Sequence, residues 1–97
     1  MPIYITLGSF TEKGLSAIKD TVKRSEAFKA QAKKMGANVK EIYWTQGAHD
    51  IVTIIEAPDD TVASALMLSV SKLGNVNGQT LRGFSAAEME KILDKVV

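Results

Sequence analysis

The order of strand-type and helix-type patterns constrains the fold of this chain more than any other feature of its sequence. Apolar residues alternate with others over Ile3–Leu7, which is the period of two of a strand. A β-branched and aromatic stretch at Val39–Thr45 and an apolar run at Ile51–Ile55 predict two more strands, joined by a turn at 46–49. A weaker strand pattern follows at Val76–Arg82.

Helix-type patterns separate these strands. Apolar or small residues recur every three or four positions over 15–35 and over 62–73, and Gly36 and Gly74 follow these stripes as stop signals. The first helix has two alternative starts, since Asp20 or Thr21 can cap a fresh helix. Residues 11–35 therefore form either one helix or two.

A last short helix is predicted near the C-terminus, where Ser85 and Glu88 have the spacing of a capping box. The complete order is strand, helix, strand, strand, helix, strand and an extra helix. This order predicts an α+β fold of the ferredoxin-like βαββαβ type, with helices on one face of a four-stranded antiparallel sheet. The apolar run Ile51–Ile55 suits a strand buried on both faces, so we expect it inside the sheet. A single domain over residues 1–97 is expected, because domains usually have about 100–150 residues.

Helices on one face leave the other face of the predicted sheet uncovered. Alternate side chains of the strands place apolar and aromatic groups there, and water penalises such groups by about 25 cal/mol per Å². We therefore expect a homodimer or a higher homo-oligomer to cover this face, with a small-molecule ligand as a further partner.

Composition excludes several classes of function. Cysteine is absent, which rules out disulfides, thiol nucleophiles and cysteine-ligated zinc or iron–sulfur centres. One histidine cannot make a histidine-rich metal site within one chain, and no glycine-rich nucleotide motif is present. Neither a metal nor another cofactor is therefore expected.

Charge and hydropathy bear on partners. Twelve basic and eleven acidic side chains give a net charge of +1, and the glycine- and aromatic-rich strand of RNA-binding sheets is missing, so no nucleic-acid partner is expected. No apolar stretch approaches the about 20 residues that cross a bilayer, and the N-terminus lacks signal-peptide features. We expect no membrane partner and a cytoplasmic location.

An ordered set of short motifs resembles the GYD-domain family. The motifs are Gly47-Ala48-His49-Asp50 before Ile51–Ile55, then Glu56-Ala57-Pro58-Asp59-Asp60, Leu73-Gly74-Asn75-Val76 and Thr80-Leu81-Arg82. The resemblance covers about residues 3–84. It implies a ferredoxin-like fold of the dimeric α+β barrel type and implies no general activity. His49 stands where the family signature has tyrosine, so no role that needs a phenol is expected there.

The turn at 46–49 and the residue after it hold the candidates for acid–base chemistry. His49 is the only histidine and thus the natural proton-transfer residue, with a solvated or structural role as the favoured alternative. Asp50 is either a catalytic carboxylate or an acceptor for turn amides. Gly47 is expected to supply a positive φ in the turn.

The ligand-binding candidates are Tyr4, Tyr43, Trp44 and Arg82. Tyr43 and Trp44 are adjacent on a strand, so they point to opposite faces and only one enters the helix-covered side. The other is expected to line a pocket or an interface on the uncovered face. Its expected neighbours are Tyr4 or Ile3 from the first strand and Thr80 or Arg82 from the last. Arg82 either clamps a ligand carboxylate or phosphate or pairs with a surface acid.

Two functional hypotheses follow. The first is a self-associating domain of unknown activity that binds a small ligand on its uncovered sheet face. The alternative is an enzyme similar to the cofactor-independent monooxygenases and isomerases of the dimeric α+β barrel superfamily. In the enzyme, His49 or Asp50 moves a proton while Tyr43, Trp44 and Arg82 hold the substrate. This alternative is an analogy at the level of the fold.

Overall fold

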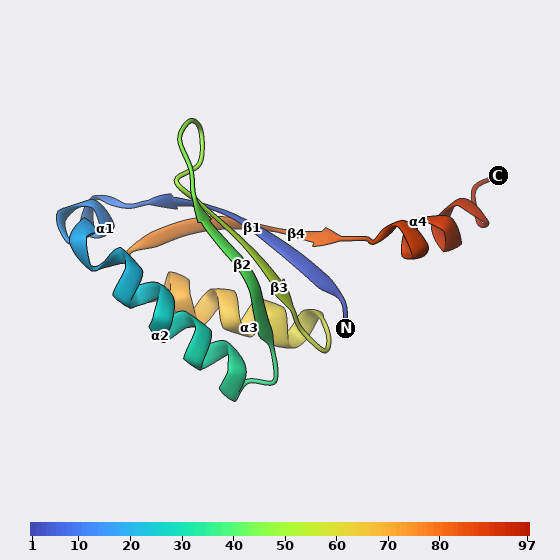
Figure 1. Cartoon of the computed structure of the whole chain (residues 1–97), viewed down its shortest axis with the longest axis horizontal. Coiled ribbons are helices and arrows are strands. Elements are labelled where there is room, and N and C mark those ends of the chain that lie inside the picture. Colours follow the sequence, from blue (N-terminus) through green and yellow to red (C-terminus); the bar gives the residue numbers. More distant parts are fainter.

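A four-stranded antiparallel sheet carries two long helices on one face, and a short C-terminal helix projects away from both (Figure 1). The structure is a computed structural model that describes residues 1–97. The elements are β1 (Ile3–Phe10), α1 (Glu12–Ser16), the 3-10 turn η1 (Ile18–Asp20), α2 (Thr21–Lys34), β2 (Asn38–Trp44), β3 (Ile51–Glu56), α3 (Asp60–Ser71), β4 (Val76–Gly83) and α4 (Ala86–Leu93).

The strand order is β2-β3-β1-β4, with every neighbouring pair antiparallel. This order confirms the predicted ferredoxin-like α+β fold. It also places β3 inside the sheet, as its apolar run predicts, and β4 at an edge. No helix of the structure combines the length and the apolar character that a membrane span needs.

Residues 11–35 form three pieces, which settles the question of one helix or two. Thr11 caps α1, because its hydroxyl accepts a hydrogen bond from the backbone N–H of Gly14 at 3.1 Å. The chain then turns through η1, and α2 begins after Asp20. Gly36 follows α2 with a φ of 83°, the left-handed conformation that its role as a stop signal requires.

The predicted apolar stripe over 15–35 is wrong in its first half. Leu15, Ile18 and Val22 are exposed, whereas Ser25 and Ala32 are buried. For Leu15 and Ile18 the reason is positional, since α1 and η1 lie past the end of the sheet rather than across its face (Figure 1). A regular stripe buries its residues only where the helix has something to pack on.

The core lies between one face of the sheet and helices α2 and α3. It consists of Tyr4, Ala32, Ala37, Ile55, Ala57, Ala63 and Leu66. Four of these seven residues are alanines, so Ile55 and Leu66 are the only large side chains that are fully buried. The core is therefore thin, and most of the large apolar side chains of the chain lie elsewhere.

The C-terminal helix begins as its capping box predicts. The hydroxyl of Ser85 accepts from the backbone N–H of Glu88 at 3.2 Å, and the carboxylate of Glu88 accepts from the backbone N–H of Ser85 at 3.1 Å. No residue of α4 is buried. The helix continues outward from the end of β4 and leaves the uncovered face of the sheet free (Figure 1).

Candidate functional site

The first strand carries its aliphatic side chains on the side that no helix covers. The side beneath the helices carries Tyr4, Thr6 and Gly8, all buried. The opposite side carries Ile3, Ile5 and Leu7, which shield one another to a half-buried state. Because α2 and α3 both lie on the first side (Figure 1), the richest aliphatic surface of β1 lacks a cover within the chain.

Strand register extends this surface across the whole sheet. Ile5 pairs with Ile54 of β3 and with Leu81 of β4, and side chains of paired residues lie on the same face. We call this surface the open face and define it by seven residues: Ile3, Ile5, Leu7, Tyr43, Val52, Ile54 and Leu81.

Polar groups border the open face. Glu56 lies on it at one end, where Lys40 forms an ion pair with Glu56 at 3.5 Å, and Glu41 lies on it along the edge strand β2, beside Ile54. Asn77 and Gln79 lie on it along β4, next to β1. An apolar centre with a polar rim is typical of the surface that one protein presents to another.

Tyr43 and Trp44 point to opposite faces, as adjacent strand residues must. Tyr43 pairs with Val52 and lies on the open face, where it is 56% exposed. Trp44 pairs with Ile51 on the helix side, and its indole N–H donates to the hydroxyl of Thr21 at 3.0 Å. Only one of the two aromatic candidates therefore reaches the open face.

Tyr4 and Arg82 face each other across β1 and β4, but on the helix side. The expectation that Arg82 or Thr80 accompanies the aromatic residue on the open face is therefore corrected. The strand alternates so that Leu81 lies on that face instead, and Ile3 lies there rather than Tyr4. The four ligand-binding candidates do not gather at one place, and their role in binding stays a prediction.

A polar cluster connects Tyr4 and Arg82 to two helices. The hydroxyl of Tyr4 donates to the carboxylate of Asp60 at the start of α3, and this hydrogen bond raises the pKa of Tyr4 above its ordinary value. The guanidinium of Arg82 lies 5.8 Å from the centre of the Tyr4 ring and 4.6 Å from that of Phe84. It also pairs with Glu88 of α4 at 3.1 Å. This ion pair corresponds to one of the two predicted roles of Arg82, and the binding of a ligand stays a prediction.

The same cluster sets the charge state of Glu88. The backbone N–H of Ser85 donates to its carboxylate and holds the pKa of Glu88 below its usual range, with Arg82 as the next contributor. Two features thus favour the ionised form of Glu88: its position at the start of α4 and the neighbouring guanidinium of Arg82.

Asp50, at the end of the hairpin turn between β2 and β3, is hydrogen-bonded to strand β1. The carboxylate of Asp50 accepts from the backbone N–H of Phe10 at 2.9 Å, and its own N–H donates to the carbonyl of Gly8 at 2.8 Å. Gly47 has a φ of 101°, as predicted for this turn. His49 is half-buried beside Asp50. This arrangement fastens the turn to β1, and a catalytic role of either residue stays a prediction.

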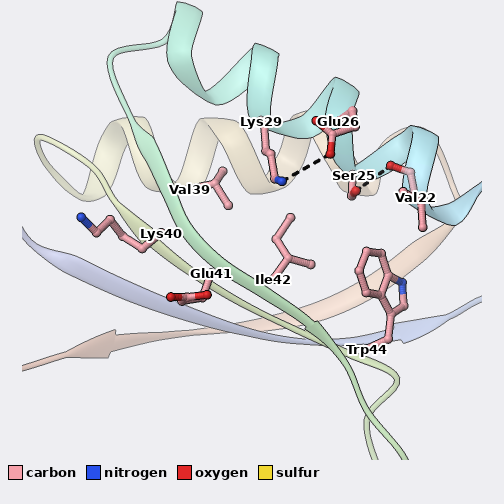
Figure 2. Close-up of a pocket in the computed structure, with 9 residues that line it drawn as sticks. All are labelled: Val22, Ser25, Glu26, Lys29, Val39, Lys40, Glu41, Ile42 and Trp44. Atoms are coloured by element: carbon pink, nitrogen blue, oxygen red, sulfur yellow. Dashed lines mark hydrogen bonds and ion pairs between the residues drawn. The ribbon is translucent and has the colours of Figure 1, made fainter.

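A groove runs between α2 and the edge strand β2, on the helix side (Figure 2). Its volume is about 360 Å³, within the range of small-molecule sites. Nine residues line it: Val22, Ser25, Glu26, Lys29, Val39, Lys40, Glu41, Ile42 and Trp44. Glu26 and Lys29 pair with each other across 3.3 Å at its rim, as Figure 2 shows.

Sequence reasoning found only Trp44 among these groove residues. The groove is formed by residues of α2 and β2 together, and local patterns do not encode how these two elements pack against each other. The structure contains no cluster of three or more histidine, aspartate or glutamate side chains arranged to hold a metal ion.

A family model of the GYD domain matches residues 4–93 of the chain. The chain belongs to the GYD domain family. This GYD domain is also similar to a solved structure, the crystal structure of TTHA0845 from Thermus thermophilus. The two share 19% sequence identity with a TM-score of 0.57, over 89% of this chain and 96% of that chain, so the likeness supports the fold alone. No curated protein matches the chain.

Proposed function

We propose that this GYD domain protein is a self-associating domain, spanning residues 1–97, whose open face packs against the same face of a second copy. The observation that carries the proposal is the distribution of side chains on β1. Ile3, Ile5 and Leu7 lie on the uncovered side, whereas the middle of the covered side holds only Thr6 and Gly8. A strand in a chain that worked alone would place its aliphatic residues under the helices.

Symmetry makes a second copy a suitable cover. In a two-fold dimer the same patch of each copy forms the interface, so the open face of one copy covers the open face of the other. Each half-buried isoleucine or leucine that becomes fully buried contributes about 1 kcal/mol. The polar rim keeps the surface soluble in the free chain and orients the two copies.

The oligomeric state in solution tests this proposal. We expect a dimer at micromolar concentration in sedimentation velocity and in native mass spectrometry. Ile5→Lys, at the centre of the open face, should raise the dimer Kd at least about 100-fold, because it buries an unpaired charge. The matched control is Leu68→Lys, since Leu68 is an exposed leucine on the outer side of α3.

Three outcomes distinguish a second copy from a small molecule as the occupant of the open face. Dimerisation that Ile5→Lys removes and Leu68→Lys leaves intact supports the proposal. A wild-type chain that is monomeric at micromolar concentration and carries a co-purifying small molecule points to the ligand instead. A monomer with no bound molecule contradicts both forms of the proposal.

A further inference from the structure

The C-terminal helix has an apolar stripe that nothing in the chain covers. Met89, Ile92, Leu93 and Val96 follow the spacing i, i+3, i+4, i+7, which aligns them on one side of a helix. All four are exposed. Val96 lies just beyond the end of α4, in a turn where its backbone N–H donates to the carbonyl of Leu93 at 3.1 Å.

The start of α4 is nevertheless connected to strand β4 by side-chain contacts. The ion pair of Arg82 with Glu88, the stacking of Arg82 over Phe84 and the capping box at Ser85 all act at the start of the helix. Helices of this length are marginal in water unless an apolar face packs against something. A capped and connected start together with an uncovered apolar stripe indicates a docking element rather than a frayed end.

The shape of the chain shows that α4 does not pack on its own body. The radius of gyration is 14.5 Å, whereas a compact chain of 100 residues has about 13 Å. The longest dimension is 50 Å against 19 Å for the shortest. Figure 1 shows the source of this elongation, which is α4 continuing outward beyond β4.

The size of the open face argues that the partner of α4 is a second copy. Four strands make a face about 19 Å wide, and the eight-pair ladder of β1 and β4 makes it up to about 27 Å long. Its flat area is on the order of 500 Å², whereas a standard interface buries about 800 Å² per partner. The open face alone falls short of a stable dimer, and the stripe of α4 supplies further apolar area at the end of the same sheet.

We propose that residues 84–97 form an arm whose apolar stripe packs on the body of the second copy, so that the two copies of a dimer exchange arms. This inference rests on the proposed function, because pairing through the open face brings the second copy beside the end of β4. The two-fold axis gives both arms the same environment, and the exchange closes the assembly at two copies. The role of Arg82 is then to aim the arm.

The test compares two double variants of equal charge change. Ile92→Asp with Leu93→Asp places two charges on the stripe. Lys91→Ala with Lys95→Ala also lowers the net charge by two, but at positions of the helix turned away from the stripe. We expect the first pair to raise the dimer Kd at least about 100-fold and the second to change it less than about threefold.

A cross-linking measurement supplies a second readout. The chain has no cysteine, so Ile92→Cys can be labelled at one site with a benzophenone maleimide. Irradiation should cross-link the arm to another chain. In a mixture of isotopically light and heavy protein, mass spectrometry of the cross-linked peptides distinguishes this product from a cross-link within one chain.

The possible outcomes distinguish a failure of the arm inference from a failure of the proposed function. If Ile5→Lys dissociates the dimer while the stripe variant leaves Kd unchanged, the arm inference is overturned and the proposed function stands. Cross-links confined to one chain, or an arm protected from hydrogen exchange only by anionic lipid vesicles, also overturn the inference. A wild-type chain that stays monomeric overturns both.

Discussion

At the scale of single residues, Thr53 is the side chain whose hydroxyl lacks a hydrogen-bond partner although it is buried. A buried hydroxyl without a partner costs about 1–3 kcal/mol. We expect Thr53→Val, which keeps the shape of the side chain, to raise the free energy of unfolding by about 1 kcal/mol. Urea unfolding at a fixed protein concentration measures this change.

The neighbouring strand provides the control for this prediction. Thr6 pairs with Thr53 across β1 and β3, but its hydroxyl lies 3.1 Å from the sulfur of Met67 and 3.4 Å from the hydroxyl of Thr80. Thr6→Val removes these contacts and should not stabilise the protein. A loss of stability in Thr53→Val would mean that its hydroxyl has a partner after all.

At the scale of elements, Glu88 connects β4 to α4, and its lowered pKa makes the connection sensitive to acid. A carboxyl whose pKa is lower in the folded than in the unfolded chain stabilises the fold above the unfolded value. This stabilisation disappears as the pH falls through the folded value. We expect α4 to lose order below the ordinary glutamate pKa of about 4.3, as measured by the NMR amide signals of residues 86–93.

Glu88→Gln is the control for the acid prediction, since glutamine keeps the capping-box hydrogen bond and lacks the charge. Its α4 signals should change less between neutral pH and pH 3 than those of the wild type. Equal changes in both proteins would assign the acid response to other carboxylates.

At the scale of the whole molecule, the thin core and the uncovered open face imply that stability depends on association. Ile55 and Leu66 are the only large side chains that are fully buried in one chain. Binding of a second copy to the folded state adds to its stability by mass action. We expect Tm to rise with protein concentration in the wild type and to be independent of it in Ile5→Lys. A constant wild-type Tm over a hundredfold range of concentration would contradict this prediction.

Local chemistry explains which features of the fold are predictable from the sequence. The order of strands and helices, the inner position of β3, the capping box at Ser85 and the positive φ of Gly36 and Gly47 each follow from residues within a few positions of one another. Side-chain period, cap chemistry and the conformational freedom of glycine act at that range. The motifs of the GYD family are local in the same sense.

The candidate site is only partly predictable, because its residues meet through strand register and helix docking. The sequence places Tyr43 and Trp44 on opposite faces, but the side on which the helices pack decides which residue lies on the open face. The same choice puts Tyr4 and Arg82 beneath the helices and Leu81 on the open face. Long-range packing of the elements also decides where the groove beside β2 forms and that α4 points outward.

The amino-acid sequence by itself thus determined the order of the main strands and helices and the existence of one uncovered sheet face, but not the division of residues 11–35 into α1, η1 and α2. Only the tertiary structure decided which side chains occupy that face and that α4 leaves it free. The reason is that a strand's alternation is fixed by the backbone, whereas the phase of the alternation is fixed by long-range pairing and by the side that the helices cover.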